Sequence, residues 1–310
     1  MPPPPAVPDP PDAGQRWRPA RGDAAGELLR WWLAEQVLAI RAAEGPGGAA
    51  PDVHDLRVAI RRARSALATF RPLVDASRTE PLRAELQWAA SELGRVRDAE
   101  VVLERVAAHR PEPKGAAGTA LAVRGHRALV RALEQDLDSR RPHVVEVLSS
   151  RRYRSALAAL EALAADPPLT DRATAPARCV ARRRIRQEAA RVDRLAREAL
   201  AEPLTDDRAA RLHEARKAAK RLRYAAEAAA PVTGRRVLRI AEAAEHVQDV
   251  LGEHHDTVAT RAAVAAVATA GDAATAFAVG RVHALEEAEA LRLEEVAEAA
   301  VRRLNRRSGV

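Results

Sequence analysis

The chain is poor in cysteine and has no long apolar run. Its single cysteine among 310 residues is Cys179, which excludes an intrachain disulfide framework and makes a reducing compartment the default. No segment approaches the about 18 uninterrupted apolar residues that a membrane-spanning helix requires. The start of the chain, Met1-Pro-Pro-Pro-Pro, lacks the basic and then apolar order of a signal peptide. We therefore expect a soluble, cytoplasmic protein without a membrane partner.

Aromatic residues and lysines are also scarce. Aromatic residues make up 3% of the chain, whereas hydrophobic residues make up 47%, and many of these are alanines. The scarcity of Phe and Tyr argues against a strand-rich fold, and the alanine content favours closely packed helices. The lysines are Lys114, Lys217 and Lys220, so arginine carries most of the positive charge behind the net charge of +8. Such a balance favours an acidic partner, which could be nucleic acid, anionic lipid or an inorganic polyanion.

Proline and glycine divide the chain into an expected tail and a set of helices. Residues 1–22 are rich in proline, which predicts a disordered tail. The periodicity between later breaks predicts an all-α fold with helices near 23–44, 52–71, 79–109 and 116–165, and then near 174–201, 206–229, 234–270 and 272–306. Pro142 is expected to kink or interrupt the fourth helix. Asp52 and Thr205 are expected to cap the second and sixth.

A basic motif occurs twice. His54-Asp-Leu-Arg57-Val-Ala-Ile-Arg61-Arg62-Ala-Arg64 returns 159 residues later as His213-Glu-Ala-Arg216-Lys217-Ala-Ala-Lys220-Arg221-Leu-Arg223. At about 100° per residue, each copy places basic side chains on one side of a helix and apolar side chains on the other. Each stripe extends over about 15 Å, which suits an extended polyanion better than a single phosphate.

A second motif is repeated at nearly the same offset. Leu93-Gly94-Arg95-Val96-Arg97-Asp98 returns 158 residues later as Leu251-Gly252-Glu253-His254-His255-Asp256. Nearly equal offsets for two motifs indicate that a whole bundle of helices was duplicated. Glycine disfavours a helix interior, so Gly94 and Gly252 are expected to permit close packing or a kink. Asp98 and Asp256 could orient basic side chains of the neighbouring motif helix, although ordinary solvated positions are equally compatible.

Together the four motifs, in this order, resemble the CHAD family, the conserved histidine α-helical domain, over residues 23–306. The resemblance implies two four-helix bundles related by a pseudo-twofold axis, one over residues 23–168 and one over 169–307, with a basic central channel or groove. It also implies non-catalytic binding of inorganic polyphosphate, often at polyphosphate granules. The implied ligand contacts are His54, Arg57, Arg61, Arg62, Arg64, His213, Arg216, Lys217, Lys220, Arg221 and Arg223. Arg97, Asp98, His255 and Asp256 would support them.

The sequence also departs from the family pattern. Many members carry a CYTH domain marked by Glu-x-Glu-x-Lys, and the nearest approach in this chain, Glu287-Ala-Glu289-Ala-Leu291, lacks the lysine. We therefore expect a member without that domain. Arg97 of the first copy becomes His255 in the second, so the two halves need not contribute equally.

The alternatives to polyphosphate binding are nucleic-acid binding, histidine-mediated metal binding and catalysis. Nucleic-acid binding suits the charge, but the four tryptophans do not interleave with the basic motifs as stacking platforms would. Histidine-mediated metal binding is a second alternative, but adjacent residues such as His254 and His255 point about 100° apart on a helix and cannot chelate one ion together. No paired carboxylates, nucleophile elbow or glycine-rich phosphate loop suggests an enzyme. We expect no catalytic residues, metal or cofactor.

Overall fold

The computed structural model describes residues 17–45, 50–111, 117–203, 206–268 and 271–309, and these form an all-α fold. The α-helices are α1 (Ala25–Ala43), α2 (Val53–Thr69), α3 (Ala76–Glu92), α4 (Gly94–Ala108), α5 (Ala117–Ser149), α6 (Arg151–Ala165), α7 (Ala177–Ala201), α8 (Asp206–Thr233), α9 (Leu238–Ala268) and α10 (Ala273–Ser308). Short 3-10 turns are η2 (Arg71–Leu73), η3 (Asp171–Thr174) and η4 (Arg235–Val237). Apart from two isolated bridges, the described residues form no β-structure.

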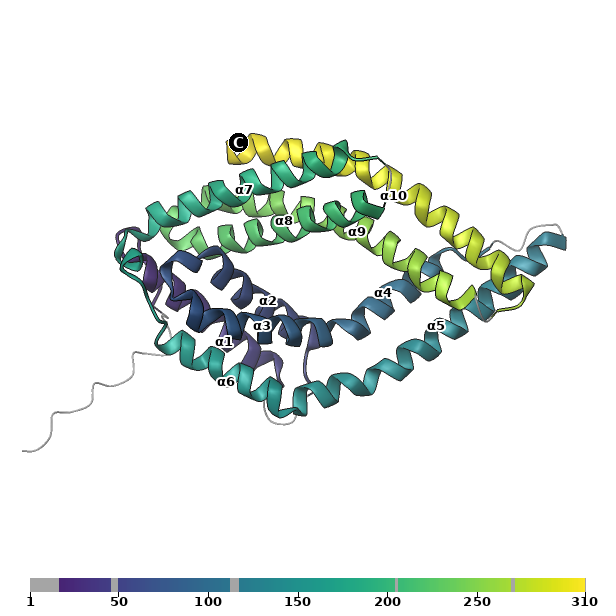
Figure 1. The fold of residues 1–310 in the computed structure, drawn as a ribbon, viewed down its shortest axis with the longest axis horizontal. Coiled ribbons are helices and arrows are strands. Elements are labelled where there is room, and N and C mark those ends of the chain that lie inside the picture. Colours follow the sequence, from purple (N-terminus) through teal and green to yellow (C-terminus); the bar gives the residue numbers. More distant parts are fainter. Residues whose placement is uncertain (1–16, 46–49, 112–116, 204–205, 269–270, 310) are drawn as a thin grey trace, which may run out of the picture.

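The helices form an elongated molecule in which the two halves of the sequence lie along opposite sides (Figure 1). Helices α1–α6 form one side, and α7–α10 form the other. At one end α1 and α2 pack against α7 and α8, and at the other end α4 and α5 pack against α9 and α10. The two sides therefore contact each other at both ends of the molecule.

Two long helices predicted from the sequence are each divided in the structure. The predicted helix 79–109 breaks at Leu93, between α3 and α4. The predicted helix 116–165 breaks at Ser150, and Pro142 lies inside α5 instead of interrupting it. The Ser150 hydroxyl accepts a hydrogen bond from the Tyr153 amide at 3.1 Å, so this serine begins a new helix as an N-cap. The position of the break was thus set by a cap that the sequence prediction overlooked.

One of the two predicted helix caps is confirmed, while the other cap and most of the expected tail lie outside the described residues. Asp52 caps α2 as predicted, because its Oδ1 accepts a hydrogen bond from the Asp55 amide at 3.0 Å. Thr205 and residues 1–16 of the expected tail lie outside the described residues. Residues 17–20, at the end of that tail, have no regular secondary structure.

The hydrophobic core explains the alanine-rich composition. One large cluster of buried residues draws on both halves, from Leu28 and Leu33 of α1 to Ala181, Ala189 and Ala196 of α7. Because most buried positions of α7 and α8 are alanines, these two helices pack closely. A second cluster joins α4, α5, α9 and α10 at the other end; its buried members are Val102, Val106, Leu129, Leu133, Val264, Val279 and Val282.

The close approach of α5 and α10 depends on one glycine. Gly125 of α5 lies directly against the α10 backbone, and a Cβ built at this position would overlap the carbonyl group of Ala274. By contrast, a Cβ at Gly280 of α10 would meet no atom within 4 Å. The two helices that join the halves at this end are therefore held at a separation that only glycine permits at position 125.

Candidate functional site

The two repeated basic stripes meet where α2 packs against α8. Lys220 of α8 lies close enough to Arg57, Arg61 and Arg64 of α2 for their charges to act on its ammonium group. Arg216, one turn earlier on α8, acts on it as well. We call these five residues, Arg57, Arg61, Arg64, Arg216 and Lys220, the cationic cluster.

Burial and mutual repulsion disfavour the charged forms of this cluster. Burial, followed by the charges of Arg216, Arg61, Arg57 and Arg64, lowers the pKa of Lys220 to about 7. Burial also lowers the pKa of Arg57, Arg64 and Arg216 from the usual value. Burial and mutual repulsion thus make it costly for the folded protein to keep these side chains positively charged.

Few carboxylates compensate these charges. Among the described residues, no carboxylate oxygen lies within 4.0 Å of the side-chain nitrogens of Arg61, Arg64, Arg216 or Lys220. Arg57 has a long ion pair of 3.6 Å with Asp98 of α4. The Nε atoms of Arg57 and Arg216 are buried and have no hydrogen-bond partner within the described part of the chain. Because unpaired buried donors are costly, an anion between these helices would satisfy groups that the protein leaves open.

Two equivalent glycines make room for two equivalent arginines. A Cβ at Gly94 would lie 3.0 Å from Nη2 of Arg57, and a Cβ at Gly252 would lie 3.4 Å from Nη2 of Arg216. Each guanidinium therefore lies against the backbone of the helix that carries the repeated glycine of its own half, α4 in the first half and α9 in the second. The expected close packing at these glycines is confirmed at both positions, and Gly94 also begins α4 after the break at Leu93.

Substituting these glycines tests their contribution to the position of the arginines. Gly94→Ala is expected to displace the Arg57 guanidinium by a few tenths of an ångström and to weaken anion binding, because 3.0 Å is too short for an ordinary contact. Gly252→Ala meets Arg216 at an ordinary contact distance and is expected to leave binding unchanged. Anion affinity by titration calorimetry and thermal melting of both variants would check this. Equal affinities of the two variants would contradict it.

Arg62 and Arg223 lie beside the cluster but are paired with carboxylates. Arg62 bonds Glu227 of α8 at 3.0 Å, and its guanidinium lies 5.6 Å from the centre of the Tyr224 ring. Arg223 bonds Glu227 at 2.8 Å and Glu245 of α9 at 2.9 Å. Their charges are therefore paired with carboxylates of the protein itself, in contrast to most charges of the cationic cluster.

Two further basic residues predicted for the site are also shared with acidic neighbours. Arg221 lies 3.8 Å from Glu188 of α7, and its charge also acts on Arg64. Lys217 is exposed and forms an ion pair of 2.6 Å with Glu214, one turn away on α8. Arg221 thus borders the cluster, whereas the structure leaves Lys217 at the surface.

The two motif histidines have different surroundings. His54 is exposed in the first turn of α2. His213 is partly buried, and its ring stacks on that of His255 from α9 with centroids 4.2 Å apart. Burial, followed by the charges of His255, Lys217 and Arg216, lowers the pKa of His213 to about 4. His213 is therefore neutral at pH 7. The two copies of the motif thus begin with the same residue type in different surroundings, exposed at His54 and partly buried at His213.

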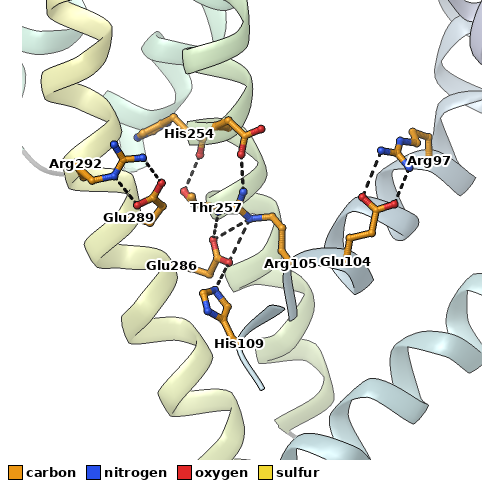
Figure 2. A network of polar contacts seen from close by, with 10 residues as sticks. Arg97, Glu104, Arg105, His109, His254, Thr257, Glu286, Glu289 and Arg292 are labelled. Atoms are coloured by element: carbon orange, nitrogen blue, oxygen red, sulfur yellow. Dashed lines mark hydrogen bonds and ion pairs between the residues drawn. The ribbon is translucent and has the colours of Figure 1, made fainter. Parts of the chain in front are cut away.

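The residues predicted to support the site differ in their partners: the two aspartates lie near arginines of the cluster, whereas Arg97 pairs with acids on its own helix. Asp98 faces Arg57, and the charge of Asp256 favours the charged form of Arg216, so each aspartate lies near the arginine of its own half. Burial raises the pKa of Asp256 to about 6. Arg97 instead forms ion pairs with Glu100 and Glu104 on its own helix, at 3.2 and 2.9 Å, and Figure 2 shows the pair with Glu104.

A buried polar contact that the sequence did not reveal joins the two halves near the cluster. Arg105 of α4 reaches Glu286 of α10 at 2.7 Å and Glu253 of α9 at 2.8 Å, and the Nε2 atom of His109 lies 2.8 Å from Glu286 (Figure 2). Glu286 is fully buried. These partners are up to 181 residues apart, and no motif spacing links them. Glu227 was also missed, although its position one turn after Arg223 is the spacing of a helical ion pair.

The described part of the chain offers neither a metal site nor a membrane span. No group of three or more His, Cys, Asp or Glu side chains could hold a metal ion there. His254 points to Glu294, 3.3 Å away, whereas its neighbour His255 stacks on His213. No described helix combines the length and apolarity needed to cross a bilayer.

A family model for the CHAD domain matches residues 23–265. The chain belongs to the CHAD domain family. The match includes α2, α8 and both repeated motifs, so the cationic cluster lies within the part of the chain that defines this membership.

Similar proteins agree with this membership. The uncharacterized protein Rv2226 of Mycobacterium tuberculosis is 30% identical over 258 residues, which cover 82% of this chain and 48% of that protein. This chain therefore spans about half the length of the curated relatives that it matches. PptA from Streptomyces chartreusis has a similar structure, with a TM-score of 0.67 and 25% identity over 91% of this chain and 99% of that one. The CHAD domain from the plant Ricinus communis shares the fold, with a TM-score of 0.65 and 24% identity over 95% and 97% of the two chains.

Proposed function

We propose that this CHAD protein binds inorganic polyphosphate without catalysing a reaction on it, and that the cationic cluster is the centre of the binding site. The observation that carries the proposal is the meeting of positive charges from both halves, Arg57, Arg61 and Arg64 from α2 with Arg216 and Lys220 from α8, which the nearby aspartates compensate only in part. Each half would contribute one bundle and one basic helix to a shared channel or groove. Exposed His54 and the bordering Arg62, Arg221 and Arg223 would extend the contacts, and the protein would act in the cytoplasm, at polyphosphate granules.

Polyphosphate matches the chemistry of this cluster. It carries about one negative charge per phosphate, and closely spaced phosphates can meet closely spaced guanidinium groups through paired hydrogen bonds. Among the described tryptophans, Trp88 contacts Arg152, with 4.1 Å between the guanidinium and the ring centre, and Trp31 packs against Trp32 on α1. Tyr224 lies beside the cluster, but it is buried next to Arg62 and Arg223 and offers no open face on which a base could stack. These features favour polyphosphate over nucleic acid.

A competition experiment tests the proposal. Long-chain polyphosphate is expected to bind the full chain at moderate salt, with an association constant that falls steeply as salt rises, because binding releases counterions. Duplex DNA and RNA, added at matched phosphate concentration, are expected to displace it poorly. More effective displacement by nucleic acid would overturn the proposal in favour of a nucleic-acid-binding function. Loss of binding on treatment with a chelator would instead favour a metal-dependent site.

Polyphosphate affinity is also expected to fall as pH rises from 6 to 9. Lys220, with its pKa of about 7, loses its proton in this range, and the cluster then loses one positive charge. A bound polyanion favours the charged lysine, so binding near pH 7.5 is expected to take up a proton. His213, with a pKa of about 4, titrates below this range, whereas Asp256, with a pKa of about 6, finishes its deprotonation at the lower end and is largely ionised at pH 7.5. Calorimetry in two buffers of different ionisation enthalpy would measure the uptake.

The same titration has the opposite effect on the ligand-free protein. The unfolded chain keeps the Lys220 proton up to the ordinary lysine pKa of 10.5, whereas the folded protein releases it above about 7. The free energy of unfolding is therefore expected to rise with pH between these two values. Lys220→Arg retains its charge throughout and serves as the control. A pH profile of binding that is unchanged in this variant would show that Lys220 is not the titrating group.

A further inference from the structure

Five arginines outside the cationic cluster line a pocket on the second half of the chain. The pocket has a volume of about 440 Å³ and lies between α7, η4 and the end of α10. Its arginines are Arg182 and Arg186 from α7, Arg236 from η4, and Arg306 and Arg307 from the last turn of α10. We call it the arginine pocket. Three elements that are distant in sequence thus contribute positively charged side chains to the lining of one pocket.

The arginine pocket has no Asp or Glu partner among the described residues. No Asp or Glu lines it, and within the described residues none of its five arginines has a carboxylate oxygen within 4.0 Å. Some exposed arginines of the same half, such as Arg194, Arg292 and Arg302, form an ion pair with a glutamate one turn away, whereas others, such as Arg239 and Arg303, have no carboxylate oxygen within 4.0 Å among the described residues. What distinguishes the pocket is that five arginines without such a partner line one space.

The arginine pocket lies on a different face of α7 from the cationic cluster. Glu188 of α7 faces Arg221 of α8 and so marks the side that borders the cluster. At about 100° per residue, Arg182 and Arg186 lie at least about 120° around the helix from Glu188. None of the five arginines is among the main charges that shift the pKa of Lys220 or Arg216. The pocket is therefore not an extension of the same stripe.

Helix ends explain only part of this arrangement. Arg306 and Arg307 lie at the C-terminus of α10, where positive charge complements the helix dipole. Arg182 and Arg186 lie in the N-terminal half of α7, where the dipole does not favour positive charge. Arg236 follows Gly234, whose φ of 89° permits the turn out of α8. An anionic ligand accounts for all five together.

We propose that the arginine pocket is a second anion-binding site, which takes a short, multiply charged phosphate group such as tripolyphosphate. Guanidinium groups bind phosphate oxygens through paired hydrogen bonds, and the volume falls within the range of about 300–1,000 Å³ typical of small-molecule sites. Ile185 and Val237 supply a buried apolar wall, which strengthens electrostatic contacts beside it. The ligand could be a free oligophosphate or the end of a longer polyphosphate chain. The proposal does not depend on what the cationic cluster binds.

Tripolyphosphate binding to paired variants tests this site. In a background that lacks the cationic cluster (Arg57, Arg61, Arg216 and Lys220 all changed to Ala), tripolyphosphate is expected to bind at one site per chain in titration calorimetry. Adding Arg182→Ala, Arg186→Ala and Arg236→Ala is expected to weaken this binding at least about 10-fold. The matched control adds Arg194→Ala, Arg292→Ala and Arg302→Ala, which removes the same charge from exposed arginines and should leave the affinity within about twofold.

The outcomes separate this site from the proposed function. Equal weakening by the pocket and control substitutions would show an effect of net charge alone and overturn the second site, as would a cluster-free background that does not bind tripolyphosphate. Neither result bears on long-chain polyphosphate at the cluster. In the otherwise unchanged protein, weaker binding of long chains after the pocket substitutions would identify the ligand as a chain end. Unchanged binding of long chains, together with loss of tripolyphosphate at the pocket, would identify a free oligophosphate.

Discussion

Replacing Arg57, Arg61, Arg216 and Lys220 together by alanine is expected to weaken binding of long-chain polyphosphate by at least about 1,000-fold. Hydrogen bonds to charged groups contribute about 1.5–3 kcal/mol each, and about 1.4 kcal/mol corresponds to a factor of ten in affinity. Because these side chains have few acidic partners, their removal leaves few carboxylates unpaired in the protein. Helical circular dichroism is expected to persist. Affinity at fixed salt, measured by calorimetry, checks the expected loss.

A control with the same change in net charge makes this result specific. Arg140, Arg194, Arg292 and Arg302 are exposed, and each forms an ion pair with an acid three or four residues away on its own helix. Changing these four to alanine removes the same number of positive charges, yet it is expected to lower the affinity less than about tenfold, since exposed pairs contribute little. If both quadruple variants lose affinity equally, binding follows total charge, and the assignment of the cluster is wrong.

Gly125→Ala is expected to lower the free energy of unfolding by about 3 kcal/mol or more, near the upper end of what overpacking costs. The added Cβ would overlap the Ala274 carbonyl group, which belongs to backbone and cannot rotate away. Helix α10 would have to move off α5, and the second hydrophobic cluster, with Leu129 of α5 and Val279 and Val282 of α10, would loosen. Equilibrium unfolding in urea measures the loss.

Gly280→Ala is the matched control for this substitution. It lies in α10, is exposed, and has no atom within 4 Å of the added Cβ. Because alanine favours a helix interior over glycine, this variant is expected to gain up to about 1 kcal/mol of stability. Two variants of equal stability would show that α5 and α10 can separate at no cost, contrary to the packing described.

The amino-acid sequence was sufficient to predict the all-α fold from its helical periodicity. The repeated motifs, at offsets of 159 and 158 residues, indicated two equivalent halves, whereas the resemblance to the CHAD family implied that their basic helices share one channel or groove. The breaks at Leu93 and Ser150 were missed because each lies in a segment with continuous helical periodicity. The Ser150 cap accounts for the second break, while the first lies directly before Gly94, which packs against the Arg57 side chain; periodicity encodes neither contact.

Charge compensation was the part of the site that the sequence described least well. The sequence pattern gave Arg62 and Arg223 the same role as Arg61 and Lys220. In the structure Glu227 forms ion pairs with Arg62 and Arg223, whereas Arg61 and Lys220 have no such partner among the described residues. The Glu227 pair with Arg223 follows a helical spacing and could have been predicted, whereas its pair with Arg62 crosses between the halves. Residues of one stripe thus differ in function because of acids brought from elsewhere in the fold.

The equivalence of Arg57 beside Gly94 and Arg216 beside Gly252 has a consequence for ligand direction. A linear polyphosphate reads the same from either end, whereas a strand of nucleic acid has distinct 5′ and 3′ ends. Two matching arginines, one from each half, offer a directionless polymer the same contacts in either orientation. A chain labelled at one end is therefore expected to occupy both orientations, with a bias set by the positions at which the halves differ, such as His54 against His213 and Arg61 against Lys220.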